Sequence, residues 1–157
     1  MKLRMKTKLL VTALFLSACV SPSTLMVNRE GKGVRCATTG YGYGVAGAIA
    51  MSAAQQSHNS CVSDYGKLGY VKIPDTAVGI NVEWNGPMIV KEVKDPAKTV
   101  GIQTGDEVLS IDGKPVANTL DTFKALDGKS VGDKVKVVVK RDNRELTFEP
   151  VLVTRGE

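Results

Sequence analysis

Short runs of alternating hydrophobic and polar residues dominate the second half of the chain. Ile80, Val82 and Trp84 alternate with polar residues and lead to Asn85-Gly86, a pair typical of two-residue hairpin turns, after which residues 88–93 return as a second strand. Later runs of the same character predict strands at residues 107–111, 135–140 and 145–151. Tight turns are expected at Asp112-Gly113 and Asp142-Asn143.

Two predicted helices interrupt these strands. Asp95 can cap the first helix, Pro96 suits its first position, and Gly101 ends it. Asn118 can cap the second helix, at residues 119–127, and its apolar side would carry Leu120, Phe123 and Leu126. The order strand, strand, short helix, strand, longer helix and two strands indicates an α+β fold.

The first half of the chain has a different composition. Small residues fill positions 45–54, and Gly69 lies where a C-terminal cap belongs, so a helix is predicted from about residue 46 to residue 68. Residues 20–35 show no sustained periodicity, and we expect a polar tether over residues 19–35. One side of the predicted helix would carry Ile49, Ala53, Ala54, Cys61, Tyr65 and Leu68.

The N-terminus has the order of a secretory signal. Four basic residues, Lys2, Arg4, Lys6 and Lys8, precede an apolar run at residues 9–16. That run is too short to cross the roughly 30 Å hydrocarbon core of a bilayer as a permanent helix. We therefore expect residues 1–18 to be removed as a signal peptide.

The end of this signal, Leu16-Ser17-Ala18-Cys19, resembles the lipobox of bacterial lipoproteins. The resemblance implies cleavage before Cys19 and attachment of acyl chains, such as palmitate, to that residue. Val20, where an Asp would favour the inner membrane, then implies an outer-membrane protein that faces the periplasm. The alternative is a soluble secreted protein in which Cys19 is incidental. An extended 17-residue tether would reach at most about 60 Å, so the domains would work close to the bilayer.

The charge balance offers no support for a nucleic-acid partner. Loss of the four basic residues of the signal lowers the formal net charge from +5 to +1. Lys and Asp are interspersed in the remainder, without a basic helix or stripe.

Cys36 and Cys61 form an even pair once Cys19 is assigned to lipid, and a secreted protein meets an oxidising compartment. We expect a Cys36–Cys61 disulfide that staples a small helical module at residues 36–73. Two free thiols, or a bond to another protein, are the alternatives. CxxC spacing is absent, which disfavours a redox or zinc role.

Residues 96–116, PAKTVGIQTGDEVLSIDGKPV, resemble the core signature of PDZ domains in periplasmic HtrA-type proteases. The resemblance covers residues 76–155. It implies a PDZ-like partly open β-barrel or sandwich of five to six strands with two helices, preceded by the disulfide-stapled module. The sequence departs from this pattern at Asn85-Gly86, where a longer loop is usual.

The PDZ resemblance also implies a function, since PDZ domains bind peptides by adding them as a strand to a sheet edge. The groove would be lined by Ala77, Val78, Gly79, Ile80, Asn81, Val82, Leu120, Phe123 and Lys124. Phe123 and Leu126 can instead belong to the core, and Trp84 can contact a ligand or cap the core. Lys72 can assist a carboxylate or be a solvated surface charge.

Catalytic motifs are missing from the sequence. The single histidine, His58, is expected to be an exposed polar residue, and no G-x-S-x-G or H-E-x-x-H motif accompanies it. Gly42, Gly44 and Gly47 match G-x-G-x-x-G, but no strand precedes them as a dinucleotide site requires. No carboxylate cluster suggests a metal, and no cofactor is expected.

Two hypotheses on function follow. The first is a membrane-anchored protein that binds peptide segments or C-termini of envelope proteins and catalyses no reaction. The second is a structural subunit of an envelope secretion or surface assembly, in which the PDZ-like domain is a fixed docking module.

Overall fold

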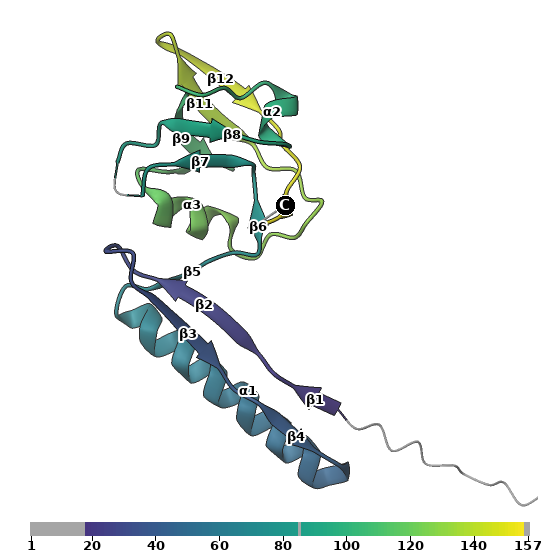
Figure 1. Cartoon of the computed structure of the whole chain (residues 1–157). Coiled ribbons are helices and arrows are strands. Elements are labelled where there is room, and N and C mark those ends of the chain that lie inside the picture. The colour runs from purple at the N-terminus through teal and green to yellow at the C-terminus, as the bar shows by residue number, and fades with distance from the viewer. Residues whose placement is uncertain (1–17, 85, 156–157) are drawn as a thin grey trace, which may run out of the picture.

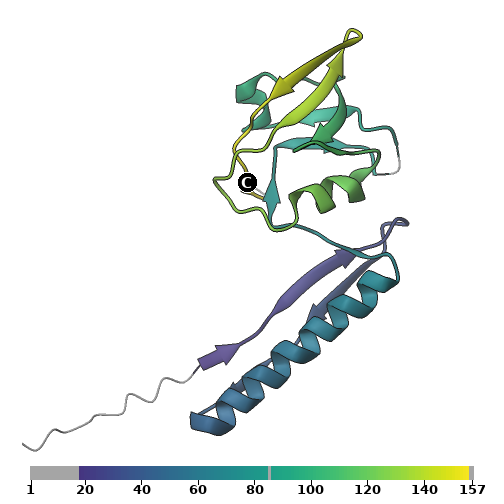
Figure 2. The same cartoon turned by 180° about the vertical axis from the view of Figure 1, so that it is seen from behind.

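The computed structural model describes residues 18–84 and 86–155, and these form two units arranged end to end (Figures 1 and 2). The N-terminal unit consists of a long helix that lies along a set of antiparallel strands. Its elements are β1 (Ala18–Val20), β2 (Ser23–Val27), β3 (Gly33–Ala37), β4 (Gly40–Gly42), α1 (Gly44–Lys67) and β5 (Val71–Lys72). The strands form a sheet of order β3-β2-β5 and a separate β1-β4 pair.

The expected tether is wrong, because strands occupy most of residues 19–35. Strand β2 pairs with β3 over five residues, from Ser23 opposite Ala37 to Val27 opposite Gly33. Met26 is only 2 % exposed. Each strand is short and buries few side chains, because the helix that covers it consists of small residues. The alternation of apolar and polar residues that indicates a strand is therefore weak in this part of the sequence.

The expected helix is present as α1. Of the residues expected on one side of it, Ala54 is buried and Cys61 is bonded to the sheet, whereas Ile49 and Leu68 are exposed. The buried residues of the helix are Gly47, Ala54 and His58. Strand β4 lies so close to α1 that a Cβ on Gly40 would be 2.7 Å from the backbone oxygen of Ala50. The glycines therefore permit close packing of strand on helix. No helix in the described part of the chain is both long and apolar enough to cross a membrane.

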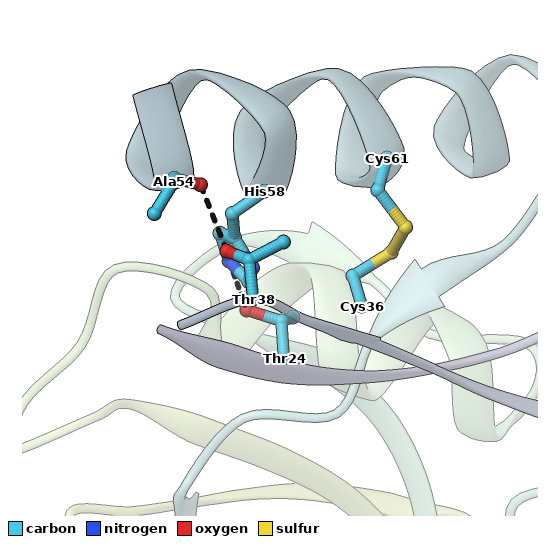
Figure 3. The surroundings of a disulfide bond; sticks show 6 residues. All are labelled: Thr24, Cys36, Thr38, Ala54, His58 and Cys61. Carbon is cyan, nitrogen blue, oxygen red and sulfur yellow. Dashed lines mark hydrogen bonds between the residues drawn. A yellow bond between two sulfur atoms is a disulfide. The ribbon is translucent and has the colours of Figure 1, made fainter. Parts of the chain in front are cut away.

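The disulfide prediction is confirmed, because Cys36 on β3 and Cys61 on α1 are bonded (Figure 3). The exposed position predicted for His58 is wrong. Its side chain lies between helix and sheet, and its Nε2 is 3.0 Å from the hydroxyl of Thr24 (Figure 3). The hydroxyl of Thr38 donates to the carbonyl of Ala54 across 2.8 Å. Two side-chain hydrogen bonds and a disulfide thus tie α1 to its sheet.

The second unit confirms the predicted α+β, PDZ-like fold. A four-stranded sheet of order β10-β9-β11-β12 and two strand pairs, β13-β6 and β7-β8, enclose an apolar core with two helices. The elements are β6 (Thr76–Ala77), β7 (Ile80–Val82), β8 (Val90–Val93), α2 (Ala97–Val100), β9 (Glu107–Ile111), β10 (Lys114–Pro115), α3 (Thr119–Leu126), β11 (Val137–Arg141), β12 (Arg144–Phe148) and β13 (Val153–Thr154).

The two-residue turn predicted between the first two strands of this unit is wrong. Pairing of β7 with β8 ends at Val82 opposite Val90, so the connection spans residues 83–89. The backbone of residues 88–90 forms hydrogen bonds with the β9 region instead. The carbonyl of Met88, for example, accepts a hydrogen bond from the N–H of Val108 across 2.8 Å. Asn85-Gly86 predicts a connection that is shorter here than in HtrA-type PDZ domains. The seven-residue connection shows that this predicted difference is absent. Asn85 itself lies outside the described residues.

One ion pair is buried at the edge of the core. Asp106 is 1 % exposed and accepts two hydrogen bonds from Arg141, at 2.6 and 2.7 Å, and one from the backbone N–H of Gln103. Burial alone would raise the pKa of Asp106, but these hydrogen bonds outweigh it and hold the pKa below the ordinary value. The pair fixes β11 to the loop before β9.

Candidate functional site

Strand β7 has one paired edge and one open edge. It pairs with β8, where Ile80 lies opposite Val93, and no other strand of residues 18–84 or 86–155 pairs with it. The N–H of Lys94 donates to the carbonyl of Gly79 across 2.7 Å. Because hydrogen bonds alternate along an antiparallel ladder, the backbone groups of Ile80 point away from β8. An open edge of this kind can pair with an added strand.

A cavity of about 250 Å³ lies between this edge and α3. The residues of its lining are mostly apolar, with threonines from the helix. The lining consists of Ala77, Val78, Ile80, Asn81, Val82, Trp84, Met88, Thr119, Thr122, Phe123, Leu126 and Arg155. The hydroxyl of Thr122 is buried and has no hydrogen-bond partner in the described part of the chain. We call this cavity and the β7 edge the groove.

The turn before β7 depends on glycine. Gly79 has a φ of +79°, and a Cβ there would lie 2.6 Å from the backbone oxygen of Lys94 and 2.7 Å from that of Asp95. A side chain at this position would strain the turn whether or not a ligand is present. A substitution of Gly79 therefore cannot test ligand binding by itself.

Arg155 lies at one end of the groove. Its Nε donates to the carbonyl of Pro74 across 2.8 Å and its Nη2 to that of Thr76 across 3.2 Å. Its guanidinium carbon lies 5.0 Å from the centre of the Phe123 ring. Arginine has five N–H donors, so these bonds leave three for an anion. Partial burial lowers the pKa of Arg155, while the Asp75 charge opposes the shift, and the side chain stays protonated at neutral pH.

The position of Arg155 next to the Gly79 turn follows from long-range pairing. Strand β13 pairs with β6, with Thr154 opposite Thr76, and the N–H of Arg155 donates to the carbonyl of Asp75 across 2.7 Å. A second cavity of about 380 Å³ is lined by Ala77, Gly79, Ile80 and Arg155 among others. The guanidinium thus borders both the groove and the space beside the turn.

The N-terminal unit borders the other end of the groove. Trp84 packs on Phe123, with ring centres 6.0 Å apart, and its Nε1 donates to the carbonyl of Arg29 across 3.2 Å. Val27 of β2 packs with Leu120 and Phe123 in a small apolar cluster that also contains Val71, Ile73 and Trp84. The turn between β2 and β3 therefore holds Trp84, and Val27 of β2 supports the helix that forms the far wall.

The structure places most of the predicted groove residues around one cavity. Ala77, Val78, Ile80, Asn81, Val82 and Phe123 line the groove, and Gly79 lines the adjoining space. Leu120 does not line the groove, because it packs on the N-terminal unit. Lys124 is also outside the lining and lies 3.7 Å from Asp121.

The sequence interpretation missed Arg155, Met88, Thr119 and Thr122 as lining residues. Helical spacing was a usable signal for these threonines, because Thr119 lies four residues before Phe123 and Thr122 lies three residues after Thr119. No local pattern indicates Arg155, because the pairing of β13 with β6 brings it to the groove. Lys72 lies on β5 and does not line the groove.

Comparison with known families gives a match over this unit. Residues 74–151 match the family described as "PDZ domain". This part of the chain is a PDZ domain. It is similar to the PDZ domains of DegS-type proteases: the chain is 33 % identical over 89 residues to "Serine endoprotease DegS" of Escherichia coli (strain K12), which covers 52 % of this chain and 25 % of DegS.

A second relative of this PDZ domain is "Protease Do-like 8, chloroplastic" of Arabidopsis thaliana. It is 47 % identical over 48 residues, which cover 31 % of this chain and 11 % of the relative. The chain thus spans a quarter or less of the length of these two relatives.

Solved structures similar to the chain include a serine endoprotease from Yersinia pestis, at 18 % identity and a TM-score of 0.45. That match covers 73 % of this chain and 38 % of the other. The HtrA-type protease AlgW with decapeptide is 18 % identical, with a TM-score of 0.48, over 75 % of this chain and 38 % of the other.

Proposed function

We propose that this protein is a lipid-anchored peptide-binding protein of the bacterial cell envelope. Its PDZ groove takes an extended segment of another envelope protein as an added strand beside β7. The observation that carries the proposal is the open β7 edge, which faces a cavity with the Arg155 guanidinium at its end. PDZ domains bind extended peptides in this way.

The ligand chemistry follows from the groove. Backbone groups of Ile80 are available to an added strand, and the apolar lining suits an apolar side chain of the ligand. The unused donors of Arg155 suit a carboxylate, so the preferred ligand is a peptide C-terminus. The terminal carboxylate would lie between Arg155 and the Gly79 turn.

Anchoring follows from the sequence at the N-terminus. The signal and lipobox-like residues support acylation of Cys19, whose side chain is exposed in β1. More than one acyl chain gives stable anchoring, at about 0.8 kcal/mol per buried CH₂. Val20 favours the outer membrane, and the protein then faces the periplasm.

The proposed role is binding without catalysis. The single histidine of the chain, His58, is buried between α1 and Thr24 in the N-terminal unit rather than at the groove. The matched part of DegS is a quarter of that protease. The match to a PDZ domain over residues 74–151 supports a peptide-binding role.

Peptide binding is tested with the mature chain carrying Cys19→Ser, which leaves the rest of the protein intact. A library of C-terminal peptides should give ligands with a micromolar Kd, which corresponds to a binding free energy of about 8 kcal/mol. Amidation of the ligand's C-terminus should weaken binding about tenfold or more, since a hydrogen bond to a charged group contributes about 1.5–3 kcal/mol. N-methylation of the backbone amide that pairs with β7 should also weaken it.

The role of Arg155 is tested by comparing two peptides. Arg155→Gln should weaken binding of the free-acid peptide about tenfold and leave that of the amidated peptide unchanged. The matched control Arg144→Gln, on β12 and away from the groove, should change neither. Equal affinity of the wild-type protein for both peptides would contradict the carboxylate assignment. Absence of peptide binding, with recovery of the chain in one stable envelope complex, would favour the docking-module hypothesis.

A further inference from the structure

Large apolar side chains are exposed at the end of the N-terminal unit that lies away from the PDZ domain. Tyr41 on β4 is 80 % exposed, and Tyr43, just before α1, is 72 % exposed. Val45 and Ile49, one helical turn apart on α1, are 79 % and 63 % exposed. We call these four residues the apolar end.

The apolar end lies beside the proposed lipid anchor. Strand β1 pairs with β4 so that Cys19 is directly opposite Tyr41. Neighbouring strands lie about 4.8 Å apart, so acyl chains on Cys19 would start within about 10 Å of the Tyr41 ring. The exposed residues are therefore where a bilayer must be if Cys19 is acylated.

Charges are excluded from the same end. Residues 19–28 and 36–63 contain no Asp, Glu, Lys or Arg. The charged residues of the N-terminal unit are Arg29, Glu30, Lys32, Arg35, Asp64, Lys67 and Lys72. Asp64 is 20 residues beyond Gly44 on α1, which corresponds to about 30 Å at 1.5 Å per residue. Helix α1 therefore begins with apolar residues, continues with Ser, Gln and Asn, and ends with charged residues.

We propose that the apolar end inserts into the interface of a lipid bilayer, with the N-terminal unit standing on the membrane as a rigid spacer. This inference rests on the proposed acylation of Cys19. Tyrosine suits the interface because its ring is apolar and its hydroxyl stays hydrated. The absence of charge means that neutral lipid suffices, and anionic lipid should add little.

The spacer sets the distance between membrane and groove. Helix α1 has 24 residues and is about 36 Å long. In both views the PDZ domain lies at the end of the N-terminal unit where α1 ends, away from β1 and the start of α1 (Figures 1 and 2). The disulfide, the His58–Thr24 bond and the glycine contacts keep the helix and its sheet together. The groove is thus held on the order of 35 Å above the bilayer.

The apolar end is tested first without acyl chains. The mature chain with Cys19→Ser is mixed with phosphatidylcholine vesicles and measured by co-sedimentation. Weak binding is expected, and the triple variant Tyr41→Ser, Tyr43→Ser and Val45→Ser should reduce the partition coefficient at least tenfold. The control Leu68→Ser removes an equally exposed apolar side chain, 71 % exposed, from beyond the other end of α1 and should leave binding unchanged. Circular dichroism verifies that each variant keeps the wild-type Tm.

The second measurement uses the acylated full-length product in phosphatidylcholine vesicles. Hydrogen exchange should be slowed at residues 41–49, compared with the unacylated chain in solution, and unchanged at residues 64–68. Equal partition of the triple variant and Leu68→Ser, or no slowing at 41–49 in acylated protein, would overturn the inference. Loss of a dimer in the triple variant would instead assign the apolar end to a second copy.

Mass spectrometry of Cys19 separates the two proposals. A chain without acyl groups on Cys19 would contradict the anchoring part of the proposed function, whatever the vesicle assay gives. An acylated chain whose apolar end stays exposed would contradict only the inference made here.

Discussion

The indole Nε1 of Trp84, at the rim of the groove, donates a hydrogen bond to the backbone carbonyl of Arg29, 55 residues earlier in the chain. The same indole packs on Phe123, which lines the groove and contacts Val27 of the N-terminal unit. The groove of this PDZ domain is therefore bordered partly by another unit of the same chain. A ligand that displaces Trp84 would alter the contact between the two units.

Trp84 should report directly on occupancy of the groove. It is the single tryptophan of the chain, and it lines the cavity where the peptide is proposed to bind. Titration with a ligand peptide should shift its fluorescence emission, because the peptide replaces water around the half-buried indole. The midpoint should agree with the Kd from calorimetry. Peptide binding without any change in emission would place the site elsewhere.

Two glycines within α1, Gly47 and Gly66, should respond in opposite directions to substitution by alanine. A Cβ on Gly47 would overlap the backbone of Gly42, whereas a Cβ on Gly66 meets no atom within 4 Å. Gly66→Ala should stabilise the protein by about 0.5–1 kcal/mol through helix propensity. Gly47→Ala should destabilise it by about 1–3 kcal/mol, because the helix must move away from β4. Chemical denaturation measures both free energies of unfolding, and stabilisation by Gly47→Ala would contradict the close contact.

Loss of the disulfide should loosen the N-terminal unit selectively. Cys36 and Cys61 are 25 residues apart. In the loop-closure model, a disulfide that closes a loop of that length stabilises the folded state by about 3 kcal/mol. Cys36→Ser with Cys61→Ser should speed hydrogen exchange in α1 and leave β9 and β11 of the PDZ domain unchanged. Cys19→Ser, a control that removes the exposed cysteine, should have no such effect. Unfolding of the PDZ domain together with α1 would show that the two units depend on each other.

Asp106 should make stability depend on acid. The pKa of Asp106 is lower in the folded protein than in the unfolded chain, where it is about 3.9. The ionised carboxylate therefore contributes its full share to the free energy of unfolding above about pH 4. This contribution is lost as the pH falls towards the pKa of the folded protein. Asp106→Asn should cost about 3 kcal/mol at pH 7, because it leaves the Arg141 charge without its partner. It should also flatten the dependence of unfolding free energy on pH below about pH 4.

The control for this acid dependence is the neighbouring Asp142→Asn. Asp142 lies in the turn after β11 with a φ of +50°, a conformation that asparagine also tolerates. Its substitution should change the free energy of unfolding by less than about 0.5 kcal/mol. Equal effects of the two substitutions would contradict the assignment to the buried pair.

Local patterns in the sequence were sufficient for much of the PDZ domain. Strand β9 spans the predicted residues 107–111, and the Asn118 side chain accepts the expected capping bond from the N–H of Asp121. Asp142 and Asn143 form the predicted turn, both with positive φ. Alternation, caps and turn residues act over a few positions, so they are visible without knowledge of the fold.

Contacts between distant segments decided the rest. The strands of residues 18–37 depend on α1, which follows later in the chain, and the buried position of His58 on α1 depends on those earlier strands. The position of Arg155 depends on the pairing of β13 with β6, which lies about 77 residues earlier in the chain. The edge of β7 is open because the other strands of the described residues pair elsewhere. Periodicity shows which side of a strand is apolar, but it does not specify the partner that covers that side. By itself the sequence therefore determined a PDZ domain and the disulfide of the N-terminal unit, and tertiary structure decided what surrounds the groove.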